Sequence, residues 1–139
     1  MNYLKLIYNR SILLFSNFFY GYVKGSGVKV IGNIFISKFN VIGDYSSLIS
    51  SENGSITMEG GSSIGKNAWI ASGEGKINIG KECIFGPNVT IVAQNHGVKM
   101  INKESCLPWE RDSKAQDVLI GMRCHIGANV TILPGVKIG

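Results

Sequence analysis

The side chain in this sequence that is best suited to acid–base chemistry is the imidazole of His96. It closes the run IGKECIFGPNVTIVAQNH, directly after Asn95, where an apolar pattern gives way to polar residues. A neutral imidazole takes up a proton near pH 7, so His96 is a candidate general base. The alternative is that His96 is a solvated turn residue with no catalytic role.

Metal chemistry has little support in the sequence. The three cysteines, Cys83, Cys106 and Cys124, show no CxxC pair and no Cys/His spacing typical of zinc, so we expect no metal. Cys83 and Cys124 fall where the apolar pattern predicts inward-pointing residues, and we expect small buried thiols in a reducing compartment. The net charge of +5 and the pI near 9.2 favour an anionic partner. The chain has no basic stripe interleaved with aromatic residues, which argues against nucleic acid.

A six-residue spacing of apolar residues dominates the second half of the chain. It is carried by Ile79, Phe85, Ile91, Ile120, Ile126, Ile132 and Ile138. A helix would need apolar residues three and four apart, and each glycine would cost it about 1 kcal/mol. A period of six instead predicts a short strand plus a turn, and such units must stack to bury their apolar residues. We therefore expect an all-β domain of stacked coils over residues 28–139, with early rungs at Ile31 and Ile42.

Residues 3–23 are aromatic and apolar but are broken repeatedly by polar side chains. The longest unbroken apolar run, Ile12–Phe15, is far too short to cross a bilayer. The spacing predicts a short amphipathic α-helix, which with its connector occupies residues 1–27. This helix either packs on the domain or a neighbouring subunit, or lies on a membrane surface with Lys5, Arg10 and Lys24 toward the headgroups.

The pattern breaks completely over residues 97–117, which form one long polar excursion, an arm that begins directly after His96. Loops of this length are usually functional or disordered, and this one is well placed to cover His96. Two of its residues could bind a sugar: Trp109 by stacking on a pyranose face, and Arg111 by pairing with an anionic group. Because Ile138 opens a new rung and no cap follows Gly139, we expect the natural protein to continue with further coils.

The segments IFGPNVTIVAQNH and VLIGMRCHIGANVTILPGVKIG, with the excursion between them, resemble the hexapeptide-repeat acyltransferases. The most similar branch is that of the maltose/galactoside and polysaccharide O-acetyltransferases, and the resemblance covers about residues 30–139. It implies a left-handed parallel β-helix in which three hexapeptides make one turn, so that Ile120 and Ile138 lie one above the other. It also implies a homotrimer whose active sites lie between neighbouring subunits.

The resemblance assigns roles to individual residues. His96 matches the catalytic base, and the amide of Ala128, in the IGAN corner, matches the oxyanion donor; an ordinary corner with Gly127 at a strained angle is the alternative reading. His125 stands where the family usually has Trp, and we expect it to line the acyl-CoA site with Gly127 and Ala128. The acceptor candidates are Asn95, Ser72, Trp109 and Arg111.

The predicted function is therefore acetyl-CoA-dependent O-acetyl transfer to a sugar hydroxyl of a surface polysaccharide or its precursor. We expect a cytoplasmic protein, at the inner face of the membrane if the N-terminal helix contacts lipid. Acetylation of a small hydroxylated antibiotic and a non-catalytic trimeric scaffold remain alternatives. The family's contacts to the adenine and phosphates of CoA lie on coils that would follow Gly139.

Overall fold

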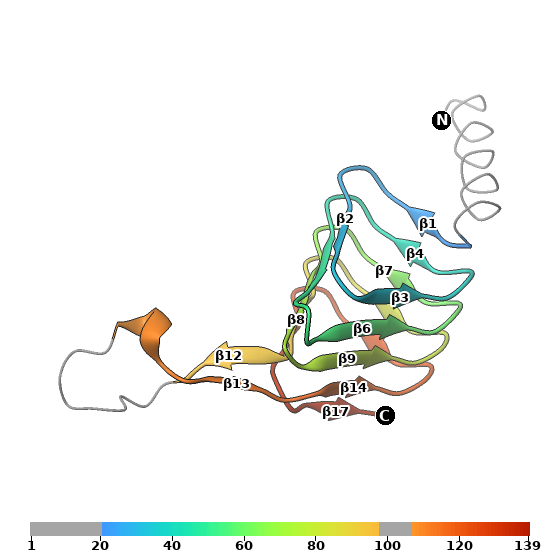
Figure 1. Ribbon diagram of the computed structural model, residues 1–139. Helices are drawn as coiled ribbons and strands as arrows, with labels where there is room; N and C mark the ends of the chain where they lie inside the picture. The colour runs from blue at the N-terminus through green and yellow to red at the C-terminus, as the bar shows by residue number, and fades with distance from the viewer. Residues whose placement is uncertain (1–20, 98–106) are drawn as a thin grey trace, which may run out of the picture.

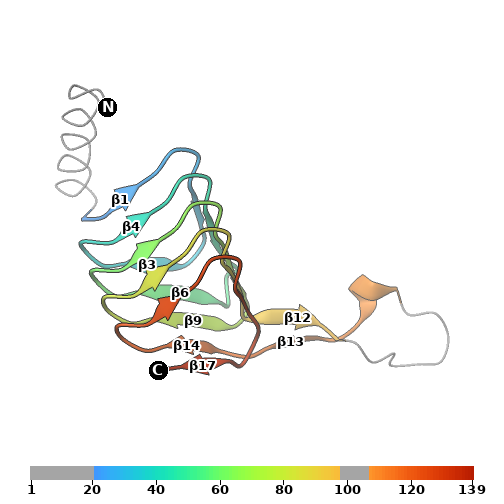
Figure 2. The same ribbon diagram turned by 180° about the vertical axis from the view of Figure 1, so that it is seen from behind.

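The chain winds into a parallel β-solenoid (Figure 1), in a computed structural model that describes residues 21–97 and 107–139. Short strands from successive coils stack into three five-stranded sheets, which form the three sides of the stack (Figure 2). Every strand pair in these sheets is parallel, as stacking of repeated units requires. The all-β stacked architecture predicted from the six-residue spacing is confirmed.

The strands have the following bounds. The first sheet contains β1 (Val23–Lys24), β4 (Val41–Ile42), β7 (Ser63–Ile64), β10 (Ile84–Phe85) and β15 (His125–Ile126). The second contains β2 (Lys29–Ile31), β5 (Ser47–Ser50), β8 (Trp69–Gly73), β11 (Thr90–Val92) and β16 (Thr131–Ile132). The third contains β3 (Ile34–Ile36), β6 (Ser55–Met58), β9 (Lys76–Ile79), β14 (Val118–Ile120) and β17 (Lys137–Ile138).

The core is a column of apolar side chains inside the coils. Successive strand residues point to opposite faces, so alternate positions turn inward, as the burial of β5 and β6 shows. The residues with the six-residue spacing point inward: Ile79, Phe85, Ile91, Ile120, Ile126 and Ile132 are all buried. Ile120 pairs with Ile138 across β14 and β17, so these two residues lie one above the other, as predicted.

The start of the solenoid differs from the prediction in two ways. The stack begins before residue 28, because Val23 in β1 already pairs with Val41 in β4. Ile31 was predicted to be an inward rung, but it is 54% exposed, whereas Val30 packs against the core and pairs with Leu48. A shift of one residue along a strand exchanges its two faces, which explains the error. The predicted helix lies outside the described residues up to residue 20, and its last residues enter β1 instead.

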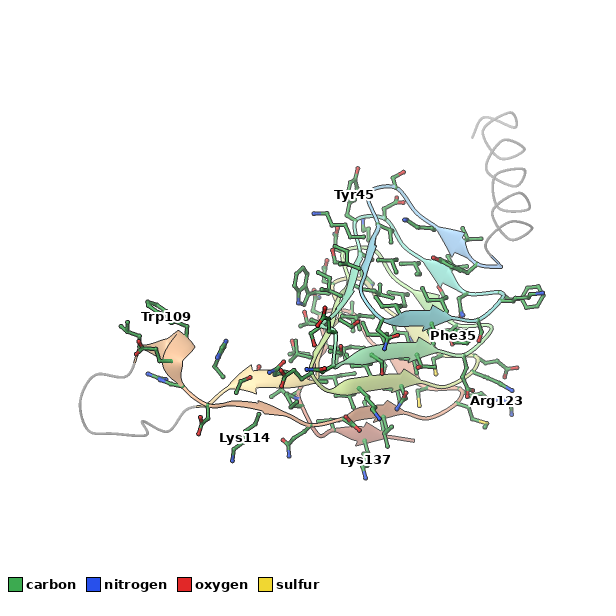
Figure 3. The ribbon with its side chains drawn as sticks, in the orientation of Figure 1. Phe35, Tyr45, Trp109, Lys114, Arg123 and Lys137 are labelled. Carbon is green, nitrogen blue, oxygen red and sulfur yellow. The ribbon has the colours of Figure 1, made fainter. Side chains whose placement is uncertain are left out.

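The corner between the first and second sheets repeats one backbone conformation. Asn67, Asn88 and Asn129 occupy it in three coils, with φ of 57°, 58° and 61°, and Asn88 donates a hydrogen bond to the side chain of Asn129 over 3.0 Å. Asn tolerates this left-handed region because its short polar side chain can bond locally. Tyr45 takes the same position with φ of 58° and a side chain that is 68% exposed (Figure 3). A bulky residue is therefore held in a conformation that disfavours it.

Replacement of Tyr45 by Asn should stabilise the solenoid by about 1 kcal/mol, because it relieves this backbone cost. The measurement is the urea midpoint of unfolding, followed by circular dichroism. Tyr45→Phe is the matched control and should change little, since it keeps the ring and the conformational penalty. A loss of stability in Tyr45→Asn would mean that the contact between the Tyr45 ring and Gly27 outweighs the backbone term.

The excursion is an ordered arm at its base and projects sideways from the stack (Figure 1). It contains an antiparallel ladder of β12 (Gln94–His96) and β13 (Ser113–Ala115), and the 3₁₀-helix η1 (Pro108–Glu110). The arm was predicted to begin at residue 97, but β12 begins at Gln94, which pairs with Ala115. His96 therefore lies on a strand of the arm rather than at a corner of a coil.

Candidate active site

His96 is exposed and lies where the arm leaves the second sheet. An open groove of about 320 Å³ runs beside it, between the arm and the coils. The groove is lined by Ala71, Gly73, Val92, Gln94, Asn95, His96 and Ser113. The structure thus places the candidate base beside a space that could receive a substrate.

The base of the arm is fixed to the coils by backbone hydrogen bonds. The amide of Gln116 donates to the carbonyl of Ala93 over 2.8 Å, and the amide of Lys76 donates to the carboxylate of Asp117 over 2.9 Å. Within the arm, the amide of Gly97 donates to the carbonyl of Asp112 over 2.6 Å. The strand that carries His96 is therefore held from both sides, which gives the backbone of His96 a defined place.

The sequence analysis missed Gln94, which joins the arm to the coil below it. Its side-chain oxygen accepts a hydrogen bond from the amide of Glu74 over 2.8 Å, and its side-chain nitrogen donates to the hydroxyl of Ser113 over 2.6 Å. Gly73 makes room for this side chain, because a Cβ there would collide with the Gln94 amide oxygen. The signal that could have found Gln94 is its place two residues before His96, on the same face of a strand.

Asn95 and Ser72, two of the four predicted acceptor-binding residues, have different outcomes. Asn95 contributes to the groove, but alternation along β12 directs its side chain away from the face that Gln94 and His96 share. Ser72 is fully buried, and its hydroxyl donates to the carbonyl of Gly73 over 3.1 Å. The prediction of an acceptor contact at Ser72 is therefore wrong.

The structure keeps His125, Gly127 and Ala128 apart from His96. His125 is exposed on β15 in the first sheet, and Gly127 and Ala128 follow at the corner that leads to the second sheet. The arm leaves at the other end of the second sheet's strands. Within one chain, the candidate base and the candidate oxyanion donor thus lie at opposite ends of the strands of that sheet.

The structure of the IGAN corner contradicts one of the two interpretations of this segment, the one in which Gly127 is strained. Gly127 has no positive φ; the left-handed residue of this corner is Asn129. The reading of a strained Gly127 is therefore wrong. Ala128 is exposed, and its amide N–H has no hydrogen-bond partner among the residues that the structure describes, so it is free to donate to a bound group.

Trp109 lies on η1 in the outer part of the arm, away from the coils (Figure 3), and Arg111 follows η1 directly. The Trp109 side chain is 69% exposed. The short helix η1 that carries it is closed by a hydrogen bond from the amide of Leu107 to the carboxylate of Glu110 over 3.0 Å. Arg111 Nε is buried without a hydrogen-bond partner among the described residues. Neither Trp109 nor Arg111 lines the groove at His96.

Neither of the two described cysteines, Cys83 and Cys124, lines this groove. Cys83 is buried in the core, and its thiol donates to the carbonyl of Gly121 over 3.0 Å. Burial raises the pKa of the Cys83 thiol, which keeps it neutral.

In residues 21–97 and 107–139, no group of three or more His, Cys, Asp or Glu side chains could hold a metal ion. The same part of the chain contains no helix of the length and hydrophobicity needed to cross a membrane.

These features define a class: a parallel β-solenoid with six-residue rungs and one ordered arm that carries a histidine. No protein-family model matches the chain. The chain is 41% identical over 64 residues to the putative acetyltransferase YvoF of Bacillus subtilis (strain 168), a stretch that makes up 46% of this chain and 30% of YvoF. Together with the solenoid, this similarity fits the hexapeptide-repeat acetyltransferases that the sequence resembles.

Among solved structures, the chain is similar to the polySia-specific acetyltransferase NeuO. The TM-score is 0.47 at 19% sequence identity, and the match covers 84% of this chain and 61% of NeuO. The chain thus spans less than two thirds of the length of either protein.

Proposed function

We propose that the chain acts as an acetyl-CoA-dependent O-acetyltransferase on a sugar hydroxyl of a surface polysaccharide or its precursor. The observation that carries this proposal is the exposed imidazole of His96, fixed beside an open groove by an arm that is bonded to the coils. The similarity to a putative acetyltransferase supports the same reaction class.

In this reaction His96 acts as the general base. Its imidazole takes the proton of the acceptor hydroxyl while the hydroxyl oxygen forms a bond to the thioester carbonyl carbon of acetyl-CoA. The carbonyl electrons move to oxygen, and the tetrahedral oxyanion needs a hydrogen-bond donor. When the oxyanion collapses, the carbon–sulfur bond breaks, and the leaving CoA thiolate takes the proton from the imidazolium. His96 returns to its neutral form.

The oxyanion donor in our proposal is the amide of Ala128 from a second copy of the chain, which has no hydrogen-bond partner among the described residues of its own copy. One chain cannot supply both groups to one acetyl group, because His96 and Ala128 lie at opposite ends of the strands of the second sheet. We therefore propose a homotrimer of left-handed β-helices with a site at each interface. His125 and Gly127, next to Ala128, would line the acyl-CoA side of that site.

The acceptor would lie in the groove beside His96, with Asn95 at its edge. We propose that Trp109, exposed on the arm, and the half-buried Arg111 beside it contact the more distant sugars of a chain-like acceptor. A polymer would suit these separated contacts better than a small antibiotic. The cytoplasmic location and a membrane contact through the N-terminal segment are proposals that rest on the sequence alone.

The test is free-thiol release from acetyl-CoA with a panel of sugars, oligosaccharides and hydroxylated antibiotics. Turnover with a saccharide supports the proposal, and turnover with an antibiotic alone supports the alternative substrate. No turnover with any acceptor, with the oligomer intact in analytical ultracentrifugation, would support the non-catalytic scaffold instead.

A further inference from the structure

The hydrogen bonds of Gln94 determine the direction in which the hydroxyl of Ser113 can donate. A backbone N–H can only donate, so the side-chain oxygen of Gln94 must face the amide of Glu74, at 2.8 Å. The side-chain nitrogen of Gln94 then faces Ser113, at 2.6 Å, and Ser113 Oγ is the acceptor of that bond. The orientation of this carboxamide thus follows from chemistry and needs no choice between two flips.

In this arrangement Ser113 Oγ accepts a hydrogen bond, and its own hydroxyl proton is not used. A serine hydroxyl has one proton to donate, and no partner for it lies among the described residues. Ser113 stands directly opposite His96 in the ladder of β12 and β13, and both residues line the groove. Side chains of such opposed residues are neighbours on one face of the ladder. An unused donor therefore lies beside the candidate base.

We infer that Ser113 is a specificity-determining residue for the acceptor. Gln94 is the positioning residue, because its hydrogen bond to Ser113 Oγ leaves the hydroxyl proton of Ser113 free to point at the acceptor. The Ser113 hydroxyl donates to an oxygen of the acceptor adjacent to the hydroxyl that His96 deprotonates. The preferred acceptor then carries a neighbouring hydroxyl, ring oxygen or carboxylate, as sugars do. A site built to bond such an oxygen discriminates against an analogue that lacks it. This inference rests on the proposed acetyl transfer.

Two substitutions test the inference by different routes. Ser113→Ala removes the donor. Gln94→Glu keeps an oxygen for the amide of Glu74 but replaces the N–H donor by a carboxylate oxygen, so that Ser113 must turn its proton toward residue 94. Each should raise the KM for the saccharide acceptor about tenfold, the effect of one hydrogen bond, with kcat and the KM for acetyl-CoA within about threefold of wild type.

Three comparisons distinguish this role from a structural one. Ser113→Thr keeps the hydroxyl and should restore the acceptor KM, and the Gln94→Glu, Ser113→Ala double variant should be no worse than Ser113→Ala alone. A deoxy acceptor that lacks the neighbouring hydroxyl should bind wild type and Ser113→Ala equally. Ser55→Ala, which removes a hydroxyl on β6 outside the groove, is the matched control.

The same difference should appear in binding without turnover. In a His96→Ala background, NMR titration with the saccharide should give a Kd about tenfold weaker when Ser113 is also Ala. An unchanged acceptor KM and Kd in Ser113→Ala would overturn the role of Ser113 and leave the proposed acetyl transfer standing. Absence of turnover by the wild-type protein with every acceptor would instead overturn the acetyl transfer, and this inference with it.

Discussion

His96→Ala should reduce kcat for acetyl transfer by about 10²–10⁴-fold, the usual contribution of a positioned general base. Without the imidazole, no group among the described residues that line the groove can take the acceptor's proton near pH 7, since Gln94, Asn95 and Ser113 have no side chain that ionises there. The KM for acetyl-CoA should stay within about twofold, because His96 acts on the acceptor. The measurement is thiol release at saturating acetyl-CoA with the best acceptor of the panel.

His125→Ala provides the matched control for the loss of an imidazole. In the proposed trimer His125 of a second copy lines the acyl-CoA side of the site and takes no proton from the acceptor, so its loss should lower turnover by about tenfold at most. Sedimentation of both variants must match wild type, so that a loss of activity is not a loss of assembly. If His96→Ala retained turnover within about threefold of wild type, the general-base mechanism would be wrong.

The inward residues of the later coils could be predicted because their spacing is regular. Ile79, Phe85 and Ile91 follow each other at six residues, so the turn between each pair has a constant length and the same face returns inward. In the earlier coils the register depends on features that spacing does not reveal. Ile31 lies one position beyond the inward residue, Val30, and only its pairing in the sheet shows this.

Ser72 at the candidate site is a different case. Ile70 and Ser72 are both buried, two residues apart on β8, so the ordinary alternation of the strand turns Ser72 inward and leaves Ala71 and Gly73 on the groove. The register of β8 against β5 shifts beside Ser72, but the alternation of buried and partly exposed residues along β8 continues through it. The inward direction of Ser72 could therefore have been predicted from its distance of two residues from the apolar Ile70.

His96 itself could be identified from the sequence, but the residues that support it could not. Its candidacy follows from its residue type and from the place where the pattern ends. The contribution of Gln94 and Ser113 depends on the pairing of β12 with β13, which are distant in the chain, and the spacing of residues in the sequence does not encode that register. Long-range antiparallel pairing of this kind is fixed by contacts at both ends of the ladder, such as those of Gln116 and Gly97.

Gly65→Ala should destabilise the solenoid by about 3 kcal/mol, near the upper end of the usual cost of overpacking. A Cβ at Gly65 would lie 2.5 Å from the backbone carbon of Gly86 and 2.6 Å from the nitrogen of Pro87 in the next coil. Backbone cannot rotate away as a side chain can, so the two coils would have to separate at this corner. The measurement is the free energy of unfolding from urea titration, read by circular dichroism.

Gly127→Ala is the matched control, because Gly127 occupies the same corner position and a Cβ there would meet no atom within 4 Å. Its stability should stay within about 0.5 kcal/mol of wild type. In a stacked repeat each coil contacts only its neighbours, so Gly65→Ala weakens one interior interface and should also broaden the transition by uncoupling the coils on either side. Equal, small effects of the two substitutions would show that the stacked corners can adjust to a methyl group, and that glycine there serves a purpose other than close approach of the coils.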